Sequence, residues 1–119
     1  GLFRTSQLAV RVTDMSIISE AMDRLRNRPP TTLLDRPVDV CDLNDPSNGS
    51  KLPQQNAIEL TGPRIHVVAR PSGTEPKLKC YLEVRATAAE SSADLTATKA
   101  RLDADMAILR EEMAQALGI

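Results

Sequence analysis

The residues with the clearest chemical potential lie in one short stretch, which runs from Arg70 to Pro76 with the sequence RPSGTEP. The guanidinium of Arg70 is a planar fork that can donate to two oxygens of one phosphate group. Ser72 and Thr74 each add a hydroxyl donor, and Gly73 lets backbone N–H groups approach an anion because it has no side chain. This combination of donors favours a phosphate-binding loop.

The charged residues at the end of this stretch are harder to assign. We expect Glu75 to orient Arg70 or a backbone amide, or to point to water, because a carboxylate repels an anion. Lys77 begins the following strand and can add positive potential. The composition also fits an ordinary turn, since Pro, Ser, Gly and Thr are common between strands. It does not fit a Walker loop, which has a Lys-Ser/Thr pair and leads into a helix.

Alternating apolar residues predict the strands that position this stretch. Residues 77–85 alternate strictly, which predicts a strand with Leu78, Cys80, Leu82 and Val84 on its inward face. Residues 57–60 and 64–69 are predicted to form a hairpin around a tight turn at 61–63. Two further strands are predicted at residues 7–13 and 38–43, and polar turn formers predict a loop over 44–56.

Two amphipathic helices are predicted from apolar residues at helical spacing. The first begins after a cap at Asp14 or Ser16 and ends before a Pro-Pro pair. The second runs over residues 92–117 after a serine cap at 91 or 92, and Gly118 follows it as a stop signal. Its apolar stripe consists of Leu95, Leu102, Met106, Leu109, Met113 and Leu117.

This order of elements predicts a two-layer α+β fold. Strands that follow one another as hairpins favour an antiparallel sheet, here of about four to five strands, and two amphipathic helices can cover one of its faces. A chain of 119 residues is long enough for one domain with a real core but not for two.

Composition excludes several function classes. The net charge is -1 and aromatic residues make up 2%, which argues against nucleic-acid binding by a basic surface or by base stacking. We find no apolar stretch that would span a membrane and no signal peptide. Cys41 and Cys80 are expected to be free thiols. His66 is the only histidine, so no metal site is expected, and an ordinary strand position is favoured over a general-acid role.

The string RPSGTEPKLKCYLEV resembles the signature of the last domain of the α-D-phosphohexomutases, which include phosphomannomutase, phosphoglucomutase and phosphoglucosamine mutase. Seven consecutive residues match the family pattern, and the order of elements agrees over essentially all 119 residues. The family has four domains around a cleft. The resemblance implies that residues 1–6 are an interdomain linker and residues 7–119 the fourth domain, with a TATA-binding-protein-like β-α-β(4)-α fold. That name describes architecture and not DNA binding.

The resemblance also implies a role for the loop. In these enzymes it holds the substrate phosphate that is not being transferred, which assigns Arg70, Ser72, Gly73 and Thr74 to a hexose phosphate. Glu75 and Lys77 would support them. Hexose 1-phosphate and 6-phosphate are interconverted through a bisphosphate intermediate, with a phosphoserine and Mg²⁺ supplied by the other three domains, in the cytoplasm.

No catalytic residue is expected in this sequence. It has neither a Ser-His-Asn type phosphoserine loop nor an Asp-Gly-Asp metal loop, so the domain alone should have no mutase activity. Within the family, the PKLKCYLEV continuation favours the phosphomannomutase/phosphoglucomutase group. The alternative is a non-enzymatic α+β module whose loop binds an anion or a protein. A phosphoserine loop encoded upstream in the same reading frame would decide for the enzyme.

Overall fold

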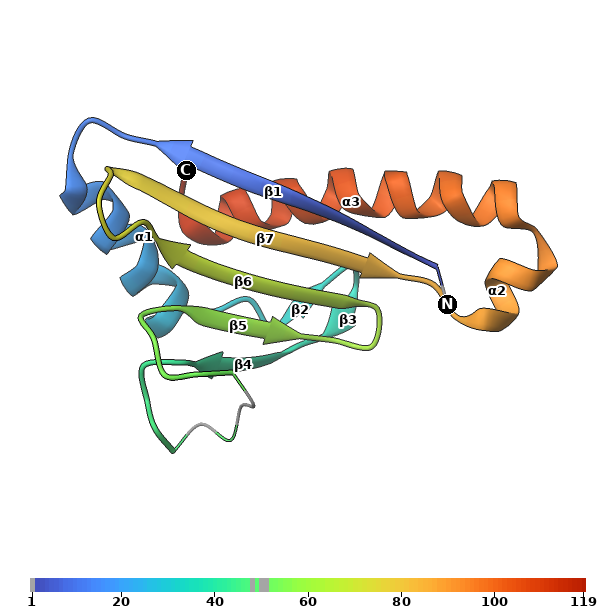
Figure 1. The fold of residues 1–119 in the computed structure, drawn as a ribbon, viewed down its shortest axis with the longest axis horizontal. Coiled ribbons are helices and arrows are strands. Elements are labelled where there is room, and N and C mark those ends of the chain that lie inside the picture. Colours follow the sequence, from blue (N-terminus) through green and yellow to red (C-terminus); the bar gives the residue numbers. More distant parts are fainter. Residues whose placement is uncertain (1, 48, 50–51) are drawn as a thin grey trace.

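A five-stranded antiparallel sheet forms one layer of the chain, with the strand order β1-β7-β6-β5-β4 (Figure 1). The computed structural model describes residues 2–47, 49 and 52–119. The strands of the sheet are β1 (Phe3–Arg11), β4 (Asp39–Asp42), β5 (Ile58–Thr61), β6 (Ile65–Pro71) and β7 (Lys77–Arg85). The predicted α+β class and the antiparallel sheet are therefore confirmed.

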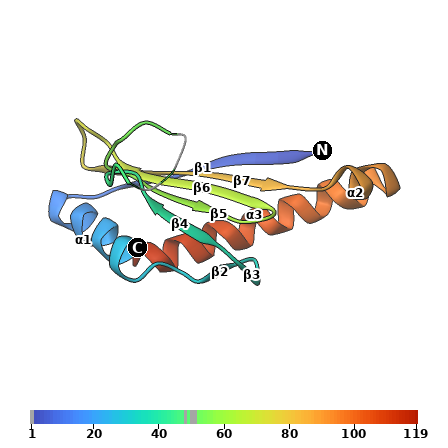
Figure 2. The same ribbon diagram turned by 90° about the horizontal axis from the view of Figure 1, so that it is seen from below.

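The helices form the second layer, on one face of the sheet. These are α1 (Met15–Asn27) and α3 (Leu95–Leu117), and both lie on the same side of the strands (Figure 2). Of the two predicted caps, Asp14 is the one that caps α1: its side chain accepts a hydrogen bond from the backbone N–H of Ser16. No helix of the described residues covers the opposite side of the sheet, and we call this side the open face.

β7 lies beside β1 and β6 and sets the register of the sheet. It pairs with β1 over nine residues and with β6 over seven. Leu78, Cys80, Leu82 and Val84 are all buried, so the predicted inward face of this strand is correct. Tyr81, which lies between them in sequence, is 38% exposed on the open face. Because side chains alternate along a strand, the residues of β7 between the buried ones point to the open face.

The core lies between the sheet and the two long helices. α1 contributes one stripe and α3 the other, and the helices also contact each other. The largest side chains with less than 2% exposure are Leu25, Leu33, Leu43, Ile58, Leu60, Leu78, Leu82, Leu102, Leu109, Met113, Leu117 and Val67. Cys41 and Cys80 are both thiols that form no disulfide, as predicted.

Several boundaries differ from the sequence prediction. β1 begins at Phe3, so residues 3–6 of the expected linker are paired with β7. A small hairpin, β2 (Thr32–Leu33) and β3 (Arg36–Pro37), was not predicted. Its turn places Leu34 and Asp35 at φ values of 52° and 60°, which non-glycine residues adopt infrequently.

The predicted C-terminal helix is two helices. A short helix, α2 (Ala88–Ala93), precedes α3, and Asp94 rather than a serine caps α3. Leu95 was expected in the apolar stripe but is 49% exposed, because α3 starts beyond the end of the strands (Figure 1). Gly118 ends α3 in the left-handed conformation, with φ at 75°, as the stop signal predicted. In the part of the chain that the structure describes, no helix has the length and apolarity to span a bilayer.

Candidate functional site

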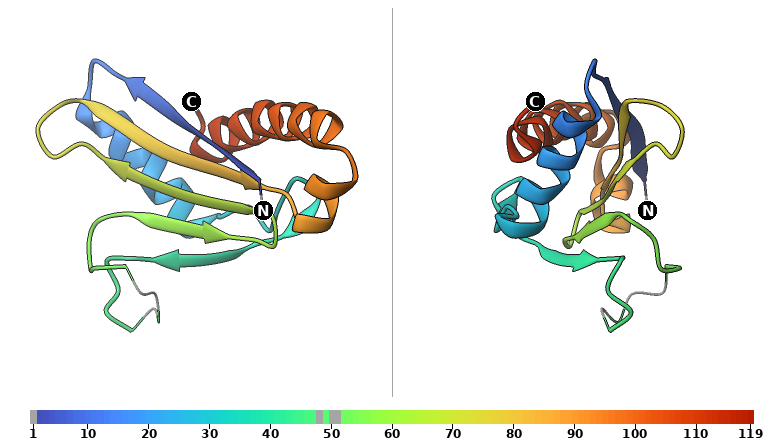
Figure 3. Two further views of the ribbon diagram at one scale, coloured as in Figure 1. Left: turned by 45° about the vertical axis from the view of Figure 1, so that its right-hand side comes forward. Right: turned by 90° about the vertical axis from the view of Figure 1, so that its left-hand side faces the viewer.

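The predicted loop connects β6 to β7 at the end of the sheet beside α1, and it projects from the strands (Figure 3). Backbone hydrogen bonds hold it in place. The N–H of Ser72 donates to the carbonyl of Lys77 at 2.8 Å, and the N–H of Val12 donates to the carbonyl of Pro76 at 2.9 Å. Pro71 and Pro76 have restricted φ angles, which limits the alternatives open to both ends. The loop is thus fixed to β7 and to the segment that follows β1.

A hollow of about 490 Å³ lies between this loop and α1. Arg70, Ser72 and Gly73 line it from the loop, one side of α1 lines it from the helix layer, and Gln55 and Asn56 close another side. Thr74 is exposed and is not part of the lining. Three of the four predicted phosphate contacts therefore border one hollow.

A second arginine, Arg26, also lines the hollow but is already paired. Its Nε donates to Asp42 at 2.8 Å and its Nη2 donates to Asn56 at 3.1 Å. Asp23 lies 3.5 Å from Nη1 of the same guanidinium. Of the two arginines that line the hollow, Arg26 thus holds neighbouring segments together through these contacts. Arg70 has no such ion pair among the described residues.

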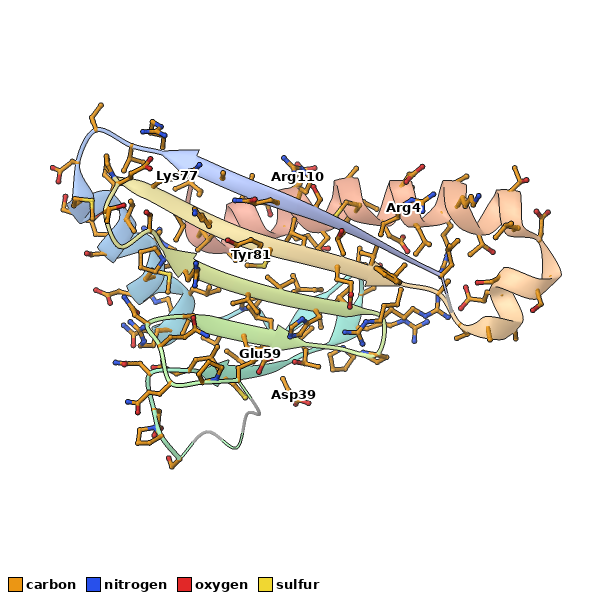
Figure 4. All side chains as sticks on the ribbon, in the orientation of Figure 1. Arg4, Asp39, Glu59, Lys77, Tyr81 and Arg110 are labelled. Atoms are coloured by element: carbon orange, nitrogen blue, oxygen red, sulfur yellow. The ribbon has the colours of Figure 1, made fainter. Side chains whose placement is uncertain are left out.

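The guanidinium of Arg70 lies over the ring of Tyr81, with 5.9 Å between its central carbon and the ring centroid. Tyr81 lies on the open face of β7 (Figure 4). A cation above an aromatic face is held by electrostatic attraction to the ring. Among the described residues, no carboxylate is within ion-pair distance of Arg70. Tyr81 therefore holds the guanidinium of Arg70 in position, and no described carboxylate balances its positive charge.

Glu75 makes an ion pair that sequence reasoning missed. Its carboxylate accepts from Nη2 of Arg11 in β1 at 2.9 Å and not from Arg70. The signal that would have found this pair is the strand pairing of Arg11 with Lys77, because it brings β1 next to the end of the loop. The acidic residue of the loop is thus balanced by a neighbouring strand, which leaves Arg70 available.

The small residues of the loop leave space for a ligand. Ser72 Oγ accepts from the N–H of Thr74 at 3.5 Å, a long contact that a better acceptor can replace. A side chain added at Gly73 would meet no protein atom within 4 Å. Crowding by the protein therefore does not explain this glycine.

The other side chains that could react, His66 and Cys80, are either paired or buried. His66 Nε2 lies 2.7 Å from Glu59 Oε2, an ion pair or hydrogen bond between adjacent strands. Burial raises the pKa of the Cys80 thiol to about 12, which keeps it protonated and unreactive. Within residues 2–47, 49 and 52–119, no group of three His, Cys, Asp or Glu side chains is placed to hold a metal ion.

Comparison with known proteins identifies the family of this chain. Residues 8–109 match the family model described as phosphoglucomutase/phosphomannomutase, C-terminal domain. The chain belongs to this family. It is also 37% identical over 86 residues to a Haemophilus influenzae protein described as a probable phosphomannomutase. The aligned part covers 71% of this chain but only 17% of that relative. The chain is thus a phosphohexomutase C-terminal domain.

Proposed function

We propose that this domain holds the phosphate group of a hexose phosphate in a phosphomannomutase/phosphoglucomutase-type enzyme. The enzyme would interconvert hexose 1-phosphate and hexose 6-phosphate through a bisphosphate intermediate. The phosphoserine that transfers the phosphoryl group and the Mg²⁺ that assists it would belong to the other domains. The domain by itself would then bind substrate without turning it over.

The observation that supports this proposal best is the position of Arg70 in a member of this family. Its guanidinium lies over the ring of Tyr81 and has no carboxylate partner among the described residues, and Arg70 lines a hollow together with Ser72 and Gly73. Phosphate oxygens accept hydrogen bonds from the arginine fork, from hydroxyls and from backbone N–H groups. All three donor types are present here.

Such a site suits a mutase because it contacts the phosphate and not the sugar. The intermediate has to turn around between two phosphoryl transfers, so either of its phosphates must fit the same loop. Donors that recognise only a phosphate group permit both orientations. Binding energy from the phosphate that is not reacting then positions the reacting one elsewhere in the enzyme.

The test is Arg70→Ala in the full-length enzyme. We expect kcat/KM to fall by about 100-fold, because two charge-assisted hydrogen bonds together contribute about 3 kcal/mol. Arg70→Lys should have an intermediate effect, since it keeps the charge but not the fork. Arg36→Ala, which removes an exposed arginine from β3, is the matched control.

Two measurements separate this role from a structural one. The melting temperature of Arg70→Ala should stay close to that of the unmodified chain. An NMR titration of the chain with glucose and mannose phosphates should shift the backbone amide signals of Arg70, Ser72, Gly73 and Thr74. Unchanged kcat/KM in Arg70→Ala would overturn the proposal, as would a full titration that moves none of these amides.

A further inference from the structure

β1 is an edge strand of the sheet, and it is long and regular. It lies at one end of the strand order and pairs only with β7, over an unbroken register of nine residues. Its sequence contains no proline, and its register contains no bulge. An edge strand of this kind presents a row of unpaired N–H and C=O groups with which another extended chain can pair. The free edge of β1 therefore offers donors and acceptors to a partner.

Hydrogen bonds at the two ends of β1 show which of its backbone groups face this free edge. The N–H of Ala86 donates to the carbonyl of Leu2, and the N–H of Val12 donates to the carbonyl of Pro76. In an antiparallel pair, residues whose backbone groups point to the partner strand alternate with residues whose groups point away. The even-numbered residues of β1 therefore point their backbone groups to β7, and the odd-numbered residues point theirs outward.

Arg110 of α3 covers the middle of the free edge. α3 runs alongside β1, and Arg110 lies where the two meet (Figure 4). Its Nη1 donates to the carbonyl of Gln7 at 3.0 Å and to the hydroxyl of Ser6 at 2.8 Å. Gln7 is the central residue of β1, and its carbonyl is one of the outward-facing groups. No other outward-facing backbone group of β1 has a hydrogen-bond partner among the described residues.

Two copies of β1 are suited to pair with each other. Identical edges that pair in antiparallel fashion are related by a two-fold axis. All nine residues overlap only when Gln7 lies opposite Gln7 of the second copy. This register places Phe3, which is 55% exposed, opposite Arg11, so that a guanidinium can lie against an aromatic ring. It places Thr5 opposite Ala9, and no two like charges of the strands face each other.

We propose that the free edge of β1 is a pairing surface for a second copy of this chain, and that Arg110 keeps this surface closed. Pairing in full register requires the carbonyl of each Gln7 to accept from the N–H of the other. Arg110 occupies that carbonyl at the two-fold axis, and its positive charge would meet the same charge from the second copy. One side chain thus blocks the register in which the edges fit best. The inference does not depend on the proposed phosphate-binding role of the loop.

The experiment compares the full-length enzyme with its Arg110→Met variant by analytical ultracentrifugation over a range of concentrations. Methionine keeps an unbranched apolar side chain beside the sheet but has neither the charge nor the donor. The variant should form a species of twice the parent's mass at concentrations about 100-fold lower than the parent requires. One charge-assisted hydrogen bond is removed from each copy, and each contributes about 10-fold. Lys99→Met removes a charge from an exposed site of α3 and should leave the mass unchanged.

A second substitution identifies the surface. Gln7→Pro removes the central outward-facing N–H, and the sheet keeps its hydrogen bonds because this N–H does not point to β7. The double variant Arg110→Met/Gln7→Pro should therefore return to the mass of the parent. Hydrogen exchange followed by mass spectrometry should show new protection of residues 3–11 in Arg110→Met and not in the double variant. Arg110→Gln, which also lacks the charge, repeats the test if Arg110→Met does not fold.

Three results would overturn the inference. If the folded Arg110 variants keep the parent's mass at every concentration, Arg110 only tethers α3 to β1. If the double variant associates as strongly as Arg110→Met, a different surface is responsible. Slow exchange of the outward-facing amides of β1 in the parent would mean that the rest of the enzyme already covers this edge.

Discussion

At the scale of single residues, the contacts and the burial of a side chain decide whether it is available to bind or to react. Arg70 has an aromatic ring beneath it and no ion pair among the described residues, whereas Arg26 is paired with Asp42. The same reasoning separates the two cysteines. Cys80 is 1% exposed on the inward face of β7, while Cys41 lies partly exposed on β4.

We predict that the two thiols differ strongly in reactivity. Burial raises the pKa of Cys80 to about 12 from an ordinary 9.0, so at pH 8 its thiolate forms mainly when the chain unfolds. Alkylation of Cys80 at pH 8 should be slower than that of Cys41 by about three orders of magnitude or more, since unfolding costs about 5 kcal/mol or more. Mass spectrometry of a time course measures both rates, and Cys41→Ser identifies the fast site.

The same pKa has a consequence at alkaline pH. Because the folded pKa of Cys80 is raised, its contribution to stability is complete below pH 9.0 and is lost as the pH rises toward 12. Modification of both cysteines at equal rates in native buffer would contradict this account of the core.

At the scale of elements, Glu90 connects three segments. It forms a capping box with Thr87 at the start of α2. Its carboxylate also pairs with Arg64 in the β5–β6 turn at 3.2 Å and with Arg101 in α3 at 2.9 Å. The hydrogen bond from the backbone of Thr87 is the main cause of a lowered pKa for Glu90. A short helix without buried residues is thus held in place by polar contacts.

Glu90→Gln should lower the melting temperature at neutral pH, because the neutral amide cannot form either ion pair. Since the folded pKa of Glu90 is lowered, its stabilisation is present above the ordinary value of 4.5 and is lost as the pH falls through the folded pKa. The gap between variant and parent should therefore close in acid. Glu20→Gln, at an exposed position of α1, is the control, and a gap that persists at low pH would refute the electrostatic explanation.

Helices and strands with a long apolar period could be predicted from the sequence, and those without one could not. β7 was predicted with its observed bounds, and α1 was predicted with two possible starts, one of which is observed, because alternation and a helical stripe extend over many residues. β2 and β3 have two residues each, too few to show a period. α2 was missed because it has no apolar stripe, although the spacing of Thr87 and Glu90 is a capping-box signal.

The candidate site was predictable only in part for a related reason. The donors of the loop are adjacent in sequence, so their types and spacing were visible at once. The pairing of Glu75 with Arg11 depends on strand register. Register across two strands is not encoded in the spacing of either one alone.

At the scale of the whole molecule, one core joins the sheet to both long helices. Leu82 lies near its centre on β7, the strand that pairs with both β1 and β6, and it is 2% exposed. α3 contacts β7 and β1, and α1 contacts α3. No layer can lose its packing without exposing the apolar side chains of the other, so we expect sheet and helices to unfold together.

Leu82→Ala tests this cooperativity, since it removes about 2–5 kcal/mol of stability when a buried leucine side chain leaves a cavity. Urea unfolding followed by circular dichroism for the helices and by NMR amide signals for the sheet should give coincident transitions in parent and variant. Ile108→Ala, at a position of α3 that is 49% exposed, should change stability by less than about 0.5 kcal/mol. Separate transitions for the two layers would show that the loop between β6 and β7 and the helix beside it are stabilised independently, and a shared core would no longer explain how they keep their positions.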